Sequence, residues 1–97
     1  MEDFVLTPNC RLVLDYLYKN DKVFVGKDLI ELVGIKGIYP VLSSLCDKGL
    51  VERMEPVKRE YIGKDGNTYQ NEYKTYHITD SGKYYVDSGK NNVIVTR

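Results

Sequence analysis

Apolar residues at helical spacing predict a first helix near the start of the chain. Thr7-Pro8 is a typical helix start, because the Thr7 hydroxyl can cap backbone amides and proline fits the first helical position. We expect this helix to end near Lys19. Its buried face would consist of Cys10, Val13, Leu14 and Leu17. The short β-branched and aromatic run at residues 23–25 predicts a brief strand instead.

Two more helices follow, and the turn between them has a glycine at each end. Apolar residues in 27–33 predict a short helix that ends at Gly34, and the turn continues to Gly37. The third helix is expected to end at Lys48-Gly49, with a core face formed by Ile38, Val41, Leu42 and Leu45. Its outward side would carry mostly polar residues, including Lys36, Tyr39, Pro40, Ser43, Ser44 and Asp47.

The residues after Leu50 have the pattern of a β-hairpin. Residues 50–57 are extended in pattern, and apolar pairs flank the polar stretch 63–67. Asp65-Gly66 predicts a two-residue turn, since both positions tolerate positive φ. A hairpin centred there would contain two favourable cross-strand pairs, Ile62 with Tyr69 and Arg59 with Glu72.

A fourth helix over residues 80–86, capped by Thr79, completes the expected elements, and residues 88–97 are expected to be a tail. The 97 residues are enough for a single domain, with its core between about residues 6 and 87. The element order predicts an α+β fold of the winged helix-turn-helix type. It would have a three-helix core, a long β-hairpin wing and a short C-terminal helix, with the third helix offered to the DNA major groove.

Composition is that of an ordinary globular domain, with 42% hydrophobic and 29% charged residues. Fourteen basic and fourteen acidic residues cancel, so the excess positive charge of many nucleic-acid binders is absent. Only the distribution of charge over the surface can then decide whether DNA binds. No apolar run approaches the roughly 18 residues of a membrane helix, and the start Met-Glu-Asp-Phe lacks the basic residues of a secretion signal. We therefore expect a cytoplasmic protein without membrane contact.

Residues with metal-binding or catalytic chemistry are few. Cys10 and Cys46 are far apart in sequence, and His77 is the only histidine. This set predicts two reduced cysteines packed on apolar helix faces rather than a zinc site. His77 is expected inside a strand, the sequence shows no nucleophile or carboxylate arrangement around it, and no glycine loop for phosphates is present. We expect neither catalysis nor a cofactor.

Two segments carry a resemblance to a known family. Gly37-Ile38-Tyr39-Pro40-Val41-Leu42-Ser43-Ser44-Leu45, continuing to Gly49-Leu50-Val51, resembles the Gly-x-Tyr-Pro-x-Leu-x-x-Leu pattern and Gly-Leu-Val of PadR transcription regulators. Tyr76-His77-Ile78-Thr79-Asp80-Ser81-Gly82 is similar to the end of the wing in PadR and MarR proteins. The resemblance spans roughly residues 7–86 and implies that Tyr39, the polar side of the third helix and the hairpin meet DNA. The chain departs from PadR proteins in its longer hairpin and in lacking, after the fourth helix, their long dimer-forming helices.

The candidate DNA-contacting residues are basic or polar and lie on the second and third helices or the hairpin. They are Lys27, Lys36, Tyr39, Ser43, Ser44, Lys58, Arg59, Lys64, Asn67 and Lys74. Each has a simpler interpretation: the hairpin cations would pair with Glu60 and Glu72 on a solvated strand, and the serines would serve helix packing. The third helix contains no arginine, so weak sequence specificity is expected.

Several tyrosines allow two interpretations. Tyr61, Tyr69 and Tyr73 on the hairpin could stack on single-stranded bases, but cross-strand packing explains them equally and is favoured. Tyr84 and Tyr85 would close the core or form an association surface.

Together these features predict a double-stranded DNA-binding transcription regulator, a repressor by hypothesis. It would act as a homodimer through the first helix, the fourth helix and the tail, where residues 93–95 could add a strand. The alternative is a protein-interaction module of the same fold, favoured by the zero net charge and the arginine-free third helix. A continuous positive face over the third helix and the wing would favour DNA, and an apolar or acidic face a protein partner.

Overall fold

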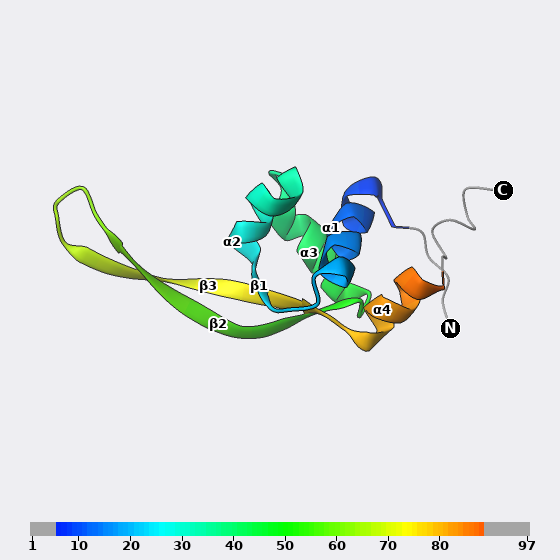
Figure 1. Ribbon diagram of the computed structural model, residues 1–97. Coiled ribbons are helices and arrows are strands. Elements are labelled where there is room, and N and C mark those ends of the chain that lie inside the picture. The colour runs from blue at the N-terminus through cyan, green and yellow to red at the C-terminus, as the bar shows by residue number, and fades with distance from the viewer. Residues whose placement is uncertain (1–5, 89–97) are drawn as a thin grey trace.

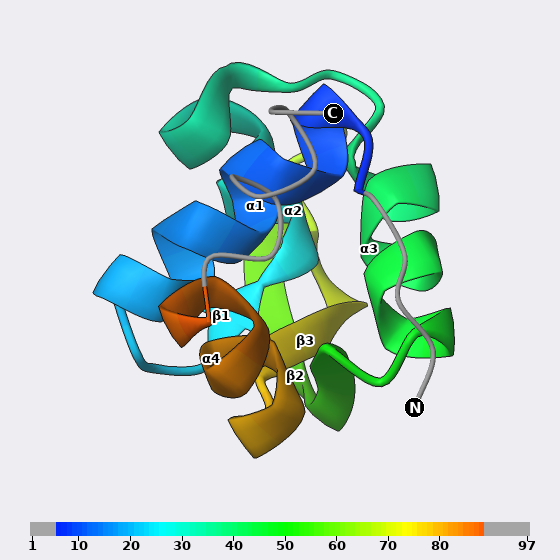
Figure 2. The ribbon, with the colours of Figure 1, turned by 90° about the vertical axis from the view of Figure 1, so that its right-hand side faces the viewer.

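Helices and a long two-stranded ribbon occupy opposite ends of the molecule (Figure 1). The computed structural model describes residues 6–88. Its elements in chain order are α1 (Pro8–Lys19), β1 (Phe24–Val25), α2 (Gly26–Leu29), the π-helical turn η1 (Ile30–Gly34), α3 (Ile38–Asp47), β2 (Val51–Ile62), β3 (Thr68–Ile78) and α4 (Asp80–Asp87). The three strands form an antiparallel sheet in the order β1-β3-β2. This arrangement confirms an α+β fold, and Figure 2 shows α1, α3 and α4 around the base of the sheet.

Helix α1 begins and ends as its sequence predicts. The Thr7 hydroxyl accepts a hydrogen bond from the Cys10 amide at 3.3 Å, and Pro8 occupies the first turn. At the other end the Asn20 amide donates to the Tyr16 carbonyl at 3.0 Å. The four residues expected to form the core face, Cys10, Val13, Leu14 and Leu17, are all buried.

The second helix occupies the expected place but changes its winding. It starts at Gly26, and after Leu29 it continues as a single π-helical turn to Gly34. Gly34 has a φ of 84°, a left-handed conformation that ends the helix at little cost for glycine. Periodicity alone does not distinguish a π turn from an α turn, so the sequence predicts the helix but not its winding.

Helix α3 packs its apolar face against α1, α2 and the first part of β2. Ile38, Leu42 and Leu45 are fully buried, and Val41 packs at the edge of the core. Pro40 lies in the first turn, where a missing amide leaves no intrahelical bond unmade. The helix ends before Gly49, whose φ is 75°, and the Gly49 amide donates to the Cys46 carbonyl at 3.0 Å.

One hydrophobic core joins the helices to the base of the sheet. Beside the helix residues it contains sheet residues that are almost fully buried, namely Phe24, Val51, Tyr76 and Ile78. Within residues 6–88, no single helix is long and apolar enough to span a membrane. The segments Gly26–Gly34 and Ile38–Asp47 reach the required length only together, and they are bent by 111° with respect to each other.

The hairpin pairs one residue out of the expected register. Tyr61 lies opposite Tyr69 and Ile62 opposite Thr68, so the predicted pair of Ile62 with Tyr69 is wrong. Arg59 likewise lies opposite Asn71 rather than Glu72. The difference comes from the turn, which has three residues instead of two.

The turn is a tight bend that Gly66 closes. The Gly66 amide donates to the Gly63 carbonyl at 3.0 Å, and the Gly63 amide donates to the Asn67 carbonyl at 2.8 Å. Gly66 has a φ of 83°, whereas Asp65 keeps an ordinary negative φ. This is a type I turn followed by a left-handed glycine, the usual three-residue hairpin loop. The Asp65-Gly66 pair therefore predicted the place of the turn correctly and its type incorrectly.

A bulge divides β2 into two parts. The register shifts between Met54 and Val57, so β2 contains one more residue than β3 at this point. Pro56, which has no amide to donate to a ladder, lies in the bulge. The Thr75 hydroxyl donates to the Glu55 carbonyl at 2.8 Å and so satisfies a group that the ladder leaves out.

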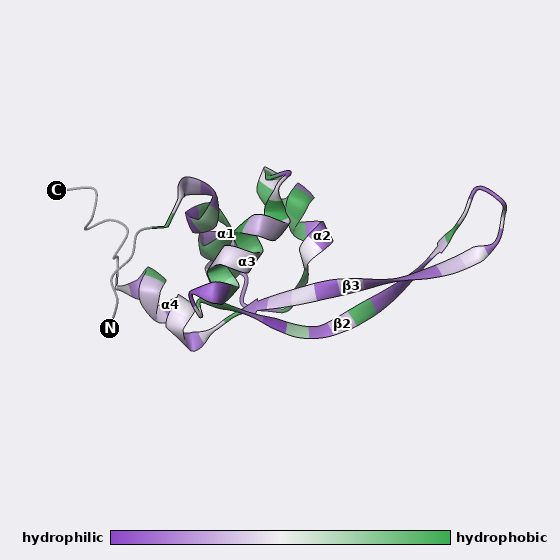
Figure 3. Ribbon diagram, turned by 180° about the vertical axis from the view of Figure 1, so that it is seen from behind, coloured by the Kyte–Doolittle hydropathy of each residue, from purple (hydrophilic) through white to green (hydrophobic). Residues whose placement is uncertain are grey.

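Beyond the bulge, residues 57–73 form what we call the distal ribbon. It extends away from the helices and gives the molecule extents of 57 × 22 × 21 Å (Figure 1). Its surface is mainly hydrophilic, with isolated apolar segments (Figure 3). Ile62 at its end is 76% exposed, so the distal ribbon has no core of its own.

Contacts of Thr79 and Gly82 hold helix α4 against the turn between α3 and β2. The Thr79 hydroxyl donates to the Gly49 carbonyl at 2.7 Å and accepts a hydrogen bond from the Gly82 amide at 3.0 Å. Gly82 is buried so closely against the turn between α3 and β2 that a Cβ there would overlap the Leu50 carbonyl. The predicted cap is thus confirmed. The tail at residues 89–97, including the strand suggested at 93–95, lies outside the described residues.

Candidate nucleic-acid interface

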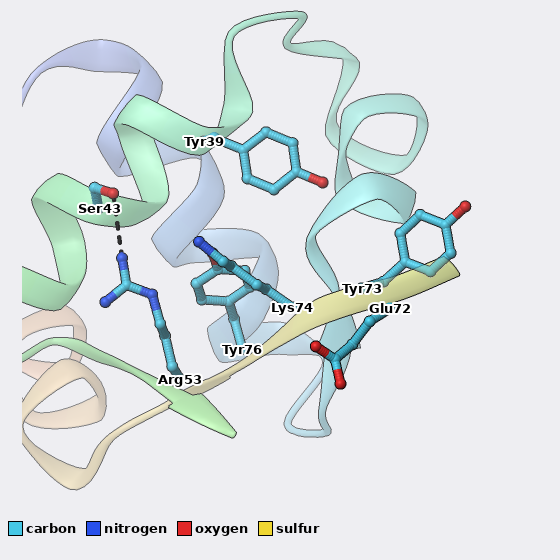
Figure 4. A pocket seen from close by; sticks show the side chains of 7 residues that line it. All are labelled: Tyr39, Ser43, Arg53, Glu72, Tyr73, Lys74 and Tyr76. Atoms are coloured by element: carbon cyan, nitrogen blue, oxygen red, sulfur yellow. Dashed lines mark hydrogen bonds between the residues drawn. The ribbon is translucent and has the colours of Figure 1, made fainter. Parts of the chain in front are cut away.

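A hollow of about 320 Å³ lies between the outward side of α3 and the base of the hairpin (Figure 4). We call it the α3–hairpin pocket. Its lining combines residues of three elements, α3, β2 and β3: Tyr39, Ser43, Arg53, Glu72, Tyr73, Lys74 and Tyr76. The pocket thus brings together hydroxyl groups, aromatic rings and two cations, the groups that proteins use to hold phosphates and sugars.

Arg53 links the two sides of this pocket. It lies opposite Tyr76 in the β2–β3 ladder, and its guanidinium group donates to the Ser43 hydroxyl at 3.3 Å (Figure 4). The same group lies 6.0 Å from the centre of the Tyr76 ring. A hydrogen bond with Tyr76 is the main cause that raises the pKa of Arg53. Like other guanidinium groups in proteins, Arg53 keeps its positive charge at any working pH.

Lys74 enters the pocket from the neighbouring strand. Its ammonium group points toward α3, whereas the carboxylate of Glu72 points away from α3 (Figure 4). Within residues 6–88, neither Arg53 nor Lys74 forms an ion pair. Neither cation is therefore neutralised by an ion pair among these residues, although Glu72 lines the pocket and Asp47 adds to the rise in the pKa of Arg53.

Tyr39 and Gly26 set the shape of the pocket at its upper end. Tyr39 projects from the first turn of α3 with its ring partly exposed. The Gly26 backbone approaches closely, because a Cβ at Gly26 would lie 2.8 Å from the Tyr76 ring and 3.0 Å from the Tyr39 ring. Glycine at the start of α2 therefore allows both rings to take their places beside the pocket.

A second cationic group ties α2 to the middle of the hairpin. Arg59 donates two hydrogen bonds to the Asp28 carboxylate, at 2.9 and 2.8 Å. Arg59 and Lys27 also lie over the Tyr73 ring, at 5.8 and 5.3 Å from its centre. The Arg59 hydrogen bonds hold the pKa of Asp28 below its ordinary value. The predicted partner of Arg59, Glu72, is replaced by Asp28, a residue distant in sequence.

The expected DNA-contacting residues form two groups, and the others lie apart from both. Tyr39, Ser43 and Lys74 meet in the α3–hairpin pocket, and Lys27 and Arg59 meet at α2. Lys36 is exposed in the turn before α3. The remaining residues do not join either group. Ser44 accepts a hydrogen bond from Lys48 on its own helix at 3.0 Å, and Lys58, Lys64 and Asn67 lie on the distal ribbon.

Sequence reasoning missed Arg53, which is central to the pocket. The signal that could have found it is alternation: Arg53 is two residues beyond the buried Val51, on the same side of β2 and therefore toward the helices. Strand β2 thus supplies an arginine beside α3, which has none of its own.

The distal ribbon carries mixed charge. Its cations Lys58, Arg59 and Lys64 are accompanied by Glu60, Asp65 and Glu72. Asp65 belongs to the turn: it accepts hydrogen bonds from the Asn67 amide at 3.0 Å and from the Tyr69 hydroxyl. The Tyr69 bond is the main cause that lowers the pKa of Asp65. The distal ribbon is thus not a continuous positive surface.

Two of the three tyrosines of the distal ribbon, Tyr61 and Tyr69, pack on each other, whereas Tyr73 lies under Lys27 and Arg59. Tyr61 and Tyr69 face each other across the strands with stacked rings, 5.6 Å between centres. This contact supports the cross-strand interpretation of both residues. On α4, Tyr85 is buried in the core, whereas Tyr84 is exposed.

His77 and the cysteines take structural positions. His77 Nε2 lies 2.7 Å from Asp21, which also pairs with Lys83 at 2.6 Å, so this group joins β3, α4 and the loop after α1. Cys10 is buried and Cys46 half-buried, both as free thiols, and burial raises the pKa of Cys46. Among residues 6–88, no group of three or more His, Cys, Asp or Glu side chains is arranged to hold a metal ion.

Comparison with known proteins gives no relative from which a function can be carried over. No protein-family model matches the chain, and no curated protein matches it significantly.

Proposed function

We propose that the chain is a DNA-binding transcription regulator with a winged helix-turn-helix arrangement. In this proposal α2 and α3 form the helix-turn-helix, the β2–β3 hairpin is the wing, and α3 lies toward the major groove. The order of the elements and the exposure of the polar side of α3 support it. The segment Gly37–Val51 is similar to PadR regulators, and the segment Tyr76–Gly82 is similar to the end of the wing in PadR and MarR regulators.

The α3–hairpin pocket is the observation that carries the proposal. Arg53 and Lys74, which form no ion pair within residues 6–88, lie beside the Ser43 hydroxyl and the first turn of α3. Cations and hydroxyls beside the helix that enters the groove are suited to bind backbone phosphates. The pocket would therefore fix the position of α3 on the duplex, while few side chains on α3 read bases. Such a regulator would act as a repressor by occupying its site.

A salt-dependent fluorescence anisotropy titration with mixed duplex DNA tests this function. We expect binding at low salt that weakens steeply as salt rises, because bound phosphates release counterions. Arg53→Ala and Lys74→Ala should each weaken binding on all sequences and reduce the salt slope by about one.

Two control variants distinguish DNA contacts made by the pocket from nonspecific attraction between DNA and exposed positive charge. Lys19→Ala removes an exposed cation from the end of α1 and should leave the affinity unchanged. Arg53→Lys keeps the charge and should retain the salt slope while losing part of the affinity, since lysine cannot make the forked contact. Absence of binding at low salt would refute the DNA proposal, and equal losses in Lys19→Ala and Lys74→Ala would refute the role of the pocket.

A protein-interaction module is the second candidate, and one observation favours it. Large apolar side chains are exposed along the hairpin, at Met54, Val57, Tyr61, Ile62 and Tyr69. Exposed apolar groups of this kind are typical of surfaces that contact protein. They lie mostly on the distal ribbon, beyond the pocket, so contact with protein there and contact with DNA at the pocket do not exclude each other.

A further inference from the structure

The outer edge of β2 has no strand beside it among the described residues. In the order β1-β3-β2, strand β2 is at the edge of the sheet over its whole length, Val51–Ile62. A long exposed edge carries unpaired amides and carbonyls, and these groups form a template for another strand. The helices cover only the base of the sheet, so the distal part of this edge is open (Figure 1).

The hydrogen bonds of the hairpin determine which residues of β2 face outward. The Gly63 amide donates to the Asn67 carbonyl, so this pair belongs to the bonded positions of the ladder. Bonded and non-bonded pairs alternate in an antiparallel ladder. Arg59 and Tyr61 therefore direct their main-chain groups toward β3, whereas Lys58 and Glu60 direct theirs to the open edge.

We propose that two copies of this chain associate by pairing their β2 edges antiparallel, about a twofold axis at Arg59. In this register Lys58 lies opposite Glu60 of the second copy, and both residues offer main-chain groups to each other. Val57 then lies opposite Tyr61 of the second copy, an apolar side chain against a ring. The hairpins would join into one four-stranded sheet. The proposal goes beyond DNA binding and does not depend on it.

Charge distinguishes this register from those in which the twofold axis is moved by one residue. An axis at Lys58 or at Glu60 also matches outward-facing groups, but it would place two lysines or two glutamates face to face. With the axis at Arg59, each outward-facing charge meets its opposite. The two Arg59 side chains would then be neighbours, and each is already neutralised by Asp28 of its own copy, which binds it through two hydrogen bonds.

The same residues limit the pairing to this one arrangement. Lysine on an edge strand, proline and a bulge normally prevent strands from adding to a sheet. Pro56 would lie opposite Ile62 of the second copy, and because proline donates no hydrogen bond, the pairing ends at the bulge. Lys58 repels most incoming strands but attracts one that carries an acidic residue at this position. The edge is consequently closed to general aggregation and open to its own copy.

Sedimentation equilibrium of the chain without DNA tests the proposal, and the choice of charges makes the test specific. The wild type should dimerise. Lys58→Glu places two glutamates on each edge and Glu60→Lys places two lysines, so each variant alone should dimerise about tenfold more weakly or worse. An equimolar mixture of the two variants should dimerise again, since every acidic residue then meets a lysine of the other variant.

Lys64→Glu is the matched control, because it makes the same change in the turn, outside the paired residues. It should dimerise as the wild type does. Hydrogen exchange gives a second measurement: the amides of Lys58 and Glu60 should gain protection as concentration rises, while that of Arg59 is protected throughout. A wild type that stays monomeric would overturn the proposal. So would single variants that dimerise like the wild type, or a mixture that is not restored.

Discussion

At the helical end of the molecule, side chains such as Leu17, Leu42 and Leu45 have no exposed surface, whereas in the distal ribbon nearly every side chain faces solvent. The two regions are therefore stabilised differently. Burial of apolar surface holds the helices to the base of the sheet. The distal ribbon depends on its own ladder, on the turn at Gly66 and on the Arg59 contact with Asp28. Substitutions should accordingly have global effects in the first region and local effects in the second.

The largest contrast should come from the same kind of truncation in each region. Leu42→Ala removes buried methyl groups from α3 and leaves a cavity between α3 and the rest of the core. We expect it to lower the free energy of unfolding by about 3 kcal/mol. Ile62→Ala, at the exposed end of the ribbon, should change it by less than about 0.5 kcal/mol. Urea denaturation measures both, and similar losses would show that the ribbon belongs to the cooperative core.

The contact of α4 with Leu50, just before β2, should be almost as sensitive. In Gly82→Ala the new methyl group would overlap the Leu50 carbonyl and approach Ile78 Cγ1 to 2.7 Å. Moving α4 to relieve this overlap should cost about 2 kcal/mol in thermal or urea denaturation. Ser81→Ala changes an exposed neighbour in the same helical turn and is the control, with little expected effect. If both variants are equally stable, α4 is not held by this close approach.

A smaller and more local effect is expected at the turn. Gly66 has a φ of 83°, which a residue with a Cβ adopts at a cost of about 1 kcal/mol. Gly66→Ala should therefore increase the hydrogen exchange of distal ribbon amides and leave the denaturation midpoint of the helices nearly unchanged. Lys64→Ala, in the same loop but without positive φ, should show neither change. A fall in global stability with Gly66→Ala would contradict the local character of the ribbon.

The smallest effect concerns the pH dependence of the ribbon contact with α2. The pKa of Asp28 is lowered in the folded chain, chiefly by its hydrogen bonds from Arg59. Its contribution to stability is therefore present above the ordinary aspartate pKa, about 3.9, and is lost as pH falls through the lower folded value. Ring proton shifts of Tyr73 in NMR should follow this loss in the wild type. In Asp28→Asn the Tyr73 shifts at neutral pH should already resemble those of the wild type at low pH. If the Tyr73 shifts of this variant still change with pH as in the wild type, a group other than Asp28 causes the change.

Local chemistry explains which parts of the fold the sequence predicts. The Thr7 and Thr79 caps, the apolar face of α3 and the glycine ends of the helices depend only on residues within one or two turns. The hairpin register was missed by one residue, because Asp65-Gly66 is compatible with two turn types and the sequence does not decide between them.

The candidate site was predictable only in part for a related reason. Tyr39, Ser43 and Lys74 follow from helix and strand patterns, and they meet in the pocket. The place of Arg53 depends on how the hairpin packs against α3, and that of Arg59 on its contact with α2, thirty-one positions away. Such contacts join residues that are far apart in the chain, and no local sequence pattern predicts them.

The tie between Arg59 and Asp28 has a mechanical consequence for the arm that the hairpin forms. An elastic beam fixed at one end bends at its tip with an amplitude that grows steeply with its unsupported length. The sheet is clamped at its base by the core, and the two hydrogen bonds at 2.9 and 2.8 Å add a second support part-way along. Only the span beyond Arg59 is then left to swing. A single carboxylate on α2 thus sets how stiffly the arm holds its direction with respect to α3.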